Sequence, residues 1–180
     1  IKDIGITTNG TLLSRPAGDF KTAAAALADA GVRTVNVSLD TLDERKYVVI
    51  TGRPYLNRVI EGIDDLIDSG FEQVKINTVL MRGRSEGDLL DLVDFSHQRN
   101  LLLRFIEMMP VSSNDVLKDS NFLPCGEVIK FLSDAFGSLQ SRSDYKTNGP
   151  ASYYMIPGRD QFIGFIGAMT NFHFCESCNK

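Results

Sequence analysis

Two cysteines near the end of the chain have the spacing of a metal or iron–sulfur site. Cys175 and Cys178 are separated by Glu176 and Ser177. A tight turn between two such thiolates points both sulfur atoms the same way, so that they can bind one metal ion or one cluster. Two ligands complete neither kind of site, because a 4Fe-4S cluster usually takes four Cys ligands, or three when it also binds a substrate. A third cysteine ligand is therefore expected beyond Lys180.

The spacing alone leaves three other interpretations open: a redox dithiol, half of a zinc site, or two unrelated thiols. The redox dithiol of a thioredoxin opens a helix directly after a strand, which residues 172–174 do not resemble. Together with Cys125, which we interpret as a plain loop or helix-start thiol, the chain has three cysteines. Such a small and odd number is typical of a reducing compartment and predicts a cytoplasmic protein.

The composition excludes several classes of function. With 180 residues, of which 43% are hydrophobic and 23% charged, the chain can form one globular unit with its own core. The net charge of -4 argues against a large nucleic-acid or membrane surface and leaves room for a local basic pocket. No apolar run approaches the roughly 18 residues of a membrane span. Because Ile1 already opens a strand-like run and the cysteine pair is incomplete, the chain is expected to be cut at both ends.

Strand-like and helix-like segments alternate along residues 1–110. Strands are predicted at 4–6, running into a polar turn, and at 34–40, 74–80 and 101–108. Helices are predicted at 20–30, 59–67 and 89–96. A further short helix is predicted to start at a capping box formed by residues 41–44. Strands separated by such helices imply right-handed parallel crossovers. We therefore predict an α/β fold, either a barrel or an open doubly wound sheet.

The pattern changes after Pro110. Residues 111–123 and 138–150 are predicted to be polar loops on either side of one amphipathic helix at 128–136. Two strand-like runs at 151–156 and 161–169 are joined by Pro157 and Gly158 in a predicted hairpin. We interpret residues 111–180 as an added subdomain that brings the cysteine pair back toward the barrel of residues 1–110.

The polar residues of the predicted strands share one side. Helices that cover a sheet take its apolar side, so the polar set should point into a barrel or lie at its mouth, where barrel enzymes place their sites. The set consists of Thr7, Asn9, Asn36, Ser38, Asp40, Lys75, Asn77 and Arg104. Polar groups are costly to bury without partners, which makes a bound ligand their natural partner.

Lys75 and Arg104 would bring two positive charges to this site. Such charges suit a phosphate or a carboxylate. The alternative is an internal salt-bridge network with Asp40 and Glu107. Met109, at the rim, is by default a packing residue.

Five sequence blocks, in this order along nearly the whole chain, resemble the radical S-adenosylmethionine (radical SAM) GTP 3′,8-cyclases of molybdenum cofactor biosynthesis. The blocks are residues 7–10, 35–40, 75–77, 104–110 and 174–179. The resemblance implies an α/β fold with parallel strands, a partial (βα)₆ TIM-like barrel, followed by the start of a C-terminal α+β cluster-binding subdomain. It also implies a lyase that converts GTP to 3′,8-cyclo-7,8-dihydroguanosine 5′-triphosphate, with S-adenosylmethionine and 4Fe-4S clusters as cofactors.

The resemblance assigns roles to individual residues. Ser38 and Met109 match positions that hold S-adenosylmethionine. Thr7 and Lys75 match positions that contact GTP, and Arg104 matches a catalytic arginine in the barrel near the substrate. A radical must be made away from water, and anionic GTP needs cations, so these assignments also make chemical sense.

The resemblance also covers the cysteine pair, and the chain departs from the family at several points. Cys175 and Cys178 match two of the three ligands of the C-terminal 4Fe-4S cluster. The N-terminal Cys-x-x-x-Cys-x-x-Cys loop of the SAM-cleaving cluster and a Gly-Gly-Glu-Pro strand are absent from the chain, and the third C-terminal cysteine is missing. Lys180 stands where the family has an arginine, and residues 14–22 form a longer segment than expected. A polypeptide of residues 1–180 is therefore expected to be inactive by itself.

The implied partners are GTP as substrate, a second copy in a homodimer, and cyclic pyranopterin synthase as the next enzyme of the pathway, with no nucleic acid and no membrane. Two competing hypotheses stay open. One is another radical SAM enzyme with an auxiliary cluster that acts on a peptide. The other is a non-catalytic scaffold with a structural zinc half-site, which predicts zinc on Cys175 and Cys178 and indifference to GTP.

Overall fold

The computed structural model of the chain describes residues 4–109, 121–147, 149–167 and 170. The chain divides into two compact units, residues 1–77 and residues 78–180. In the part of the chain that the structure describes, no helix is long and apolar enough to cross a membrane.

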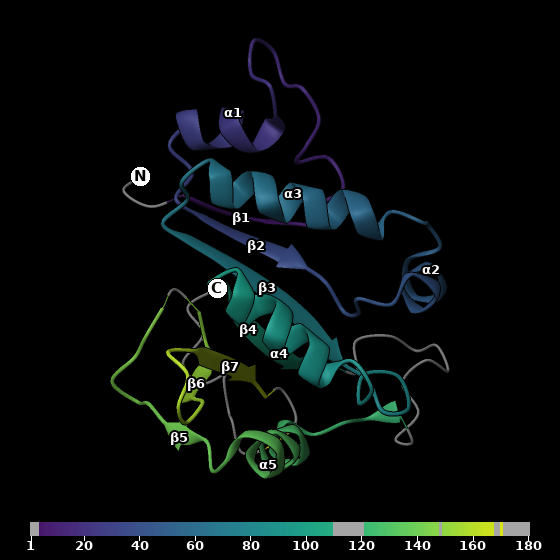
Figure 1. The fold of residues 1–180 in the computed structure, drawn as a ribbon, viewed down its shortest axis with the longest axis vertical. Helices are drawn as coiled ribbons and strands as arrows, with labels where there is room; N and C mark the ends of the chain where they lie inside the picture. Colours follow the sequence, from purple (N-terminus) through teal and green to yellow (C-terminus); the bar gives the residue numbers. More distant parts are fainter. Residues whose placement is uncertain (1–3, 110–120, 148, 168–169, 171–180) are drawn as a thin grey trace. The chain divides into compact units, whose positions relative to one another are not determined.

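The first unit contains a parallel sheet with helices in its connections (Figure 1). Its elements are β1 (Gly5–Thr8), α1 (Ala23–Asp29), β2 (Thr34–Ser38), α2 (Glu44–Thr51), α3 (Leu56–Asp68) and β3 (Gln73–Leu80), which continues into the second unit. β1 pairs with β2, and β2 with β3, both in parallel. Each crossover carries at least one helix, as the alternation in the sequence predicted.

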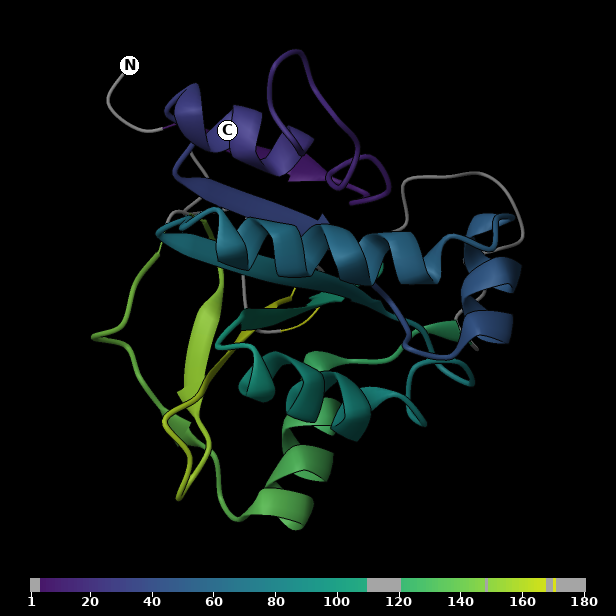
Figure 2. The same cartoon turned by 45° about the horizontal axis from the view of Figure 1, so that its top comes forward.

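Helix α3 covers the apolar side of this sheet. Val35 and Val37 of β2 are fully buried. A Cβ added at Gly10 would lie 3.0 Å from Val37 and 3.0 Å from Val59, so the apolar side of β2 lies beside α3. Helix α1 packs against α3 (Figures 1 and 2). Because side chains alternate along a strand, the polar residues of β1 to β3 point away from α3.

Two helices of this unit begin later than the sequence predicted. Helix α1 begins at Ala23 with Thr22 as its N-cap, and not at residue 20. The predicted capping box at 41–44 is wrong, because the N-cap of α2 is Asp43, whose carboxylate accepts the Lys46 N–H at 2.8 Å. Thr41 instead accepts the Asp43 N–H at 3.0 Å, in a turn that precedes the helix.

The described residues of the second unit form a mixed sheet with helices in its connections (Figures 1 and 2). After β3 its elements are α4 (Leu89–Gln98), β4 (Leu102–Glu107), α5 (Cys125–Phe136), β5 (Gln140–Ser141), β6 (Ser152–Met155) and β7 (Phe162–Ile166). β4 pairs with β7 in parallel, and β6 pairs antiparallel with both β7 and β5. The chain is thus a mixed α/β protein whose strands are mostly parallel.

The hairpin of β6 and β7 was predicted correctly, whereas the sequence made no prediction of its pairing with β4. Arg104 of β4 is in register with Gly164 of β7, and Phe105 with Phe165, whose rings lie 5.7 Å apart. The hairpin therefore continues the sheet of β4. Strand β5 lies in a stretch that was predicted to be a loop. The predicted domain boundary at residue 110 stays a prediction.

Candidate functional site

The first unit places three of the predicted polar residues in one row across its sheet. Thr7 of β1 is in register with Asn36 of β2, and Asn36 with Lys75 of β3. The Asn36 side-chain amide donates to the Thr7 hydroxyl oxygen at 3.2 Å. This row lies on the side of the sheet away from α3, as the strand alternation predicted.

Lys75 is the charged residue in this row of Thr7, Asn36 and Lys75, and 1% of its surface is exposed. A low-dielectric environment strengthens the attraction between a buried ammonium group and an anion. The same environment makes it costly to bury an ammonium group that is not paired with an anion. Ser38 is in register with Asn77 in the next row of the same side, and the Leu39 N–H donates to the Asn77 carbonyl at 2.9 Å. Ser38 itself is exposed at the carboxyl end of β2.

The second unit holds the other predicted cation, Arg104, on β4. Arg104 of β4, Gly164 of β7 and Tyr153 of β6 are neighbours in register. Arg104 is 5% exposed, and this burial lowers its pKa, while the neighbouring Tyr153 hydroxyl acts in the opposite direction. An arginine remains charged under such conditions, so the row presents a buried guanidinium.

The predicted site residues fall into both units. Thr7, Ser38 and Lys75 belong to the first unit, and Arg104 and Met109 to the second. Met109 lies two residues after the end of β4 and is 42% exposed, so it is not a buried packing residue. Cys175 and Cys178 lie outside the described residues.

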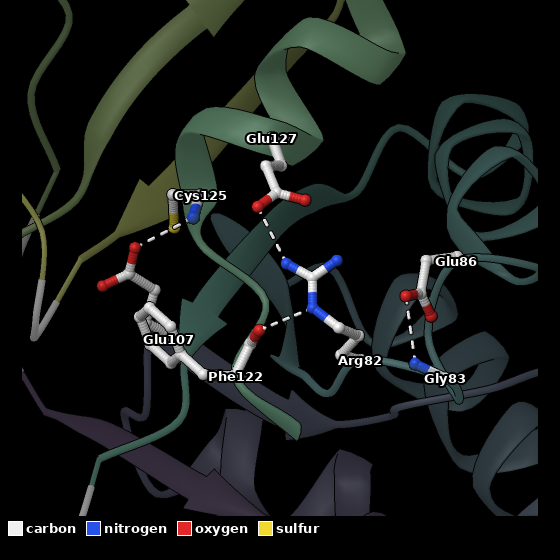
Figure 3. Close-up of polar contacts among 7 residues, drawn as sticks. All are labelled: Arg82, Gly83, Glu86, Glu107, Phe122, Cys125 and Glu127. Atoms are coloured by element: carbon white, nitrogen blue, oxygen red, sulfur yellow. Dashed lines mark hydrogen bonds and ion pairs between the residues drawn. The ribbon is translucent and has the colours of Figure 1, made fainter. Parts of the chain in front are cut away.

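Glu107, at the end of β4, contacts two other segments of the second unit. Its carboxylate accepts a hydrogen bond from the backbone N–H of Cys125, the first residue of α5, at 2.8 Å (Figure 3). It also accepts the Thr170 hydroxyl at 2.7 Å and the Thr170 N–H at 3.3 Å. Glu107 is 1% exposed. Among the described contacts it therefore acts as a buried acceptor that joins β4, α5 and residue 170.

Cys125 is the helix-start thiol that the sequence predicted. It is fully buried, and burial together with the Glu107 carboxylate raises its pKa to about 12. A thiolate is the form that binds metal, so this cysteine does not suit a metal site at neutral pH. Within the described ranges, no group of three or more His, Cys, Asp or Glu residues could hold a metal ion.

A second polar cluster near α5 lies at the surface (Figure 3). The Arg82 side chain donates to the Phe122 carbonyl at 2.9 Å and to Glu127 at 2.8 Å, and the Gly83 N–H donates to Glu86 at 3.0 Å. Arg82 and Glu127 are well exposed, and exposed ion pairs contribute little to stability. These contacts join Arg82 to Phe122 and to α5.

Sequence reasoning missed two residues beside Arg104. Gly164 is an isolated glycine within a strand pattern, which is a known signal of a close approach by another group. Tyr153 carried no such signal, because its place beside Arg104 follows from the unpredicted pairing of β4 with β7.

Comparison with known proteins defines the class. Residues 1–96 match the radical SAM superfamily, and residues 101–180 match the family Molybdenum Cofactor Synthesis C. The chain belongs to the radical SAM superfamily. Streptococcus suis SuiB bound to S-adenosylmethionine is 18% identical with a TM-score of 0.61, over 91% of this chain and 32% of that chain. At this identity the likeness concerns the fold alone.

Within the superfamily, the curated relatives are more specific. The GTP 3′,8-cyclase of Rhodopirellula baltica is 40% identical over 182 residues, which cover 100% of this chain and 48% of that protein. The GTP 3′,8-cyclase of Thermodesulfovibrio yellowstonii is 39% identical over 180 residues, which cover 100% of this chain and 53% of that protein. The chain thus spans about half the length of the curated relatives it matches.

Proposed function

We propose that the full-length protein is a GTP 3′,8-cyclase, a radical SAM lyase that converts GTP to 3′,8-cyclo-7,8-dihydroguanosine 5′-triphosphate in molybdenum cofactor biosynthesis. The observation that carries the proposal is the order of the two family matches. A radical SAM segment at residues 1–96 is followed by a Molybdenum Cofactor Synthesis C segment at residues 101–180. Relatives named GTP 3′,8-cyclase match the whole chain in one alignment.

The proposal includes an incomplete (βα)₆ barrel with its boundary at residue 110. The parallel pairs β1–β2, β2–β3 and β4–β7 support it, because parallel neighbours with helical crossovers are the units from which such barrels are built. A homodimer, a cytoplasmic location and transfer of the product to cyclic pyranopterin synthase belong to the same proposal.

Two buried cations support an anionic substrate such as GTP. Lys75 and Arg104 are 1% and 5% exposed. A triphosphate offers both of them oxygen acceptors of opposite charge. We assign GTP binding to Thr7, Lys75 and Arg104, because the Thr7 hydroxyl lies in the same row as Lys75. Arg104 also has the proposed catalytic role of stabilising negative charge on the substrate.

Ser38 and Met109 are the proposed contacts of S-adenosylmethionine. When bound, S-adenosylmethionine and its 4Fe-4S cluster supply the primary radical. Ser38 is exposed at the carboxyl end of β2, and Met109 is exposed two residues after the carboxyl end of β4. Ligands of α/β sheets bind at the carboxyl ends of the strands. A hydroxyl and an apolar thioether suit the polar and apolar parts of this ligand.

Cys175 and Cys178 are the proposed ligands of a second 4Fe-4S cluster. Their sulfur donors are the type that such clusters take, and their spacing allows both to bind one cluster. The remaining cysteine, Cys125, does not fit, because its pKa is raised to about 12 in a fully buried position. The third ligand in this proposal lies outside residues 1–180.

Calorimetric titration with GTP tests the proposal. The full-length protein, reconstituted anaerobically with iron and sulfide, is compared with Lys75→Met and with Cys175→Ala/Cys178→Ala. We expect both changes to weaken GTP binding by about tenfold or more, since a charged contact contributes about 1.5–3 kcal/mol. Lys130→Met is the matched control, because Lys130 is exposed on α5, and its affinity should match that of the wild type.

Three results would contradict the proposal in different ways. A wild-type protein that has verified iron content and does not bind GTP is no GTP 3′,8-cyclase. Zinc in place of iron on Cys175 and Cys178, with no response to GTP, would identify a structural metal site. Equal loss of affinity in Lys75→Met and Lys130→Met would show a general charge effect and no GTP contact at Lys75.

A further inference from the structure

Arg104 lies on the side of the second-unit sheet that faces away from the start of α5. Glu107, three residues further along β4, accepts the Cys125 N–H and so points to the side where α5 begins. Residues an odd number apart on a strand point to opposite sides. Gly164 and Tyr153, which are in register with Arg104, therefore share its side of the sheet.

Gly164 leaves the space that the Arg104 and Tyr153 side chains occupy. A Cβ added at Gly164 would lie 2.9 Å from Arg104 Cγ and 2.8 Å from Tyr153 Cε1. Both distances are too short for carbon atoms in contact. The Arg104 stem and the Tyr153 ring thus meet over Gly164, where any larger residue would push one of them away.

Tyr153 is itself held by the segment that precedes its strand. The Tyr153 hydroxyl and the Thr147 hydroxyl lie 2.6 Å apart. The Tyr145 ring packs edge-on against Tyr153, with centroids 5.0 Å apart, and stacks on Phe162 of β7 at 4.1 Å. These contacts fix the Tyr153 ring from a second side.

The same segment reaches the charged end of Arg104. A Cβ added at Gly149 would lie 3.5 Å from Arg104 Nη1, so Gly149 lies beside the guanidinium. The Tyr153 hydroxyl also interacts favourably with the charge of Arg104. The long and flexible arginine side chain is thereby confined along its length, by Gly164 and Tyr153 at the stem and by Gly149 at the tip.

We propose that Gly164 and Tyr153 are positioning residues for Arg104. Gly164 provides the space for its stem and Tyr153 confines it, so that the guanidinium is held ready for the phosphate groups of GTP. The inference rests on the proposed function for the identity of the ligand. An arginine confined before the ligand arrives loses less conformational entropy on binding, and therefore binds more tightly.

Substitutions in the reconstituted full-length protein test the inference. Gly164→Ala should weaken GTP binding by about tenfold, and Tyr153→Phe by about threefold, because each loosens a charged contact without removing it. Guanosine lacks phosphates, so its affinity should change much less than that of GTP. In an Arg104→Met background, Gly164→Ala should cause no further loss of GTP affinity, since residues that act through one group are not additive.

Two glycine controls separate positioning from general damage to the fold. Gly5→Ala, on β1, adds a Cβ at an ordinary 3.5 Å from the Thr34 carbonyl and should leave GTP affinity unchanged. Gly62→Ala, on α3, adds a Cβ 2.7 Å from the Gly10 carbonyl. It should lower the unfolding midpoint in urea without changing the preference for GTP over guanosine.

The outcomes distinguish this inference from the proposed function. Wild-type affinity for GTP in Gly164→Ala, or equal losses for GTP and guanosine, would overturn the positioning roles and leave the proposed function intact. A further loss in the Arg104→Met background would overturn them as well. Absence of GTP binding by the wild type would overturn the proposed function and, with it, this inference.

Discussion

Cys125 illustrates how its surroundings decide what a cysteine can do. Its thiol is fully buried, and burial, reinforced by the Glu107 carboxylate, raises its pKa to about 12. The uncharged thiol is therefore the form that the folded protein favours. A protonated thiol is a poor nucleophile and a poor metal ligand, so Cys125 serves packing at the start of α5.

This raised pKa predicts a loss of stability at high pH. The ordinary pKa is 9.0 and the folded value is about 12, so in this interval the unfolded chain releases a proton that the folded protein retains. The free energy of unfolding should then fall by up to about 1.4 kcal/mol per pH unit above about pH 9. Urea unfolding at about pH 8 and about pH 10 measures the fall.

The comparison with Cys125→Ala isolates this contribution from other groups that titrate in the same interval. The variant should be less stable at both pH values, because it leaves a cavity, but should lose less stability between them. An identical pH dependence in both proteins would show that the Cys125 thiol does not hold its proton in the folded state.

At the scale of elements, Glu107 joins the end of one strand to the beginning of a helix. Its carboxylate accepts the Cys125 N–H and two hydrogen bonds from Thr170. The first N–H groups of a helix have no partners within it, and an anion at that end is favoured by the helix dipole. One buried carboxylate on β4 therefore satisfies donors from two other segments, the start of α5 and residue 170.

Glu107→Gln should lower the free energy of unfolding by about 1–3 kcal/mol. The amide of glutamine keeps one acceptor oxygen, but its NH₂ group replaces the other oxygen and meets a hydrogen-bond donor of Cys125 or Thr170. Urea unfolding measures the change. Glu127→Gln is the matched control, since Glu127 lies in the first turn of α5, close to the N–H that Glu107 accepts, and forms the exposed pair with Arg82 (Figure 3). It should change stability little. Equal effects of the two changes would contradict the role of Glu107 as a buried acceptor.

The elements that were predicted correctly are those with strong local patterns. The alternation of Val35 and Val37 with Asn36 defined both the strand and its polar side, because burial on one face leaves a period of two in the sequence. The start of α2 was misassigned, since Thr41 and Asp43 are both good N-cap residues and local sequence does not decide between them. The row of Arg104, Gly164 and Tyr153 could not be predicted, because it depends on which distant strand pairs with β4.

At the scale of the whole molecule, the cysteine count limits what residues 1–180 can do by themselves. The polypeptide has three cysteines, and Cys125 is buried as a protonated thiol. This leaves Cys175 and Cys178 for iron, whereas the proposed enzyme needs ligands for two clusters.

A polypeptide of residues 1–180, reconstituted with iron and sulfide, should therefore not cleave S-adenosylmethionine, while the full-length protein should. Chromatography of the reaction products measures the cleavage, and iron analysis of both proteins provides the control. Cleavage by the shorter polypeptide would show that a cluster forms on ligands other than these cysteines.

The pairing of β4 with β7, and of β7 with β6, has a consequence for how such a protein can change over time. Arg104, Gly164 and Tyr153 all lie within residues 101–180, which match a single family. An exchange of this segment between related genes would carry the arginine together with the residues that confine it. A crossover between β4 and β6 would instead separate Arg104 from Gly164 and Tyr153. The recombinant protein would then have the arginine without the two residues that position it.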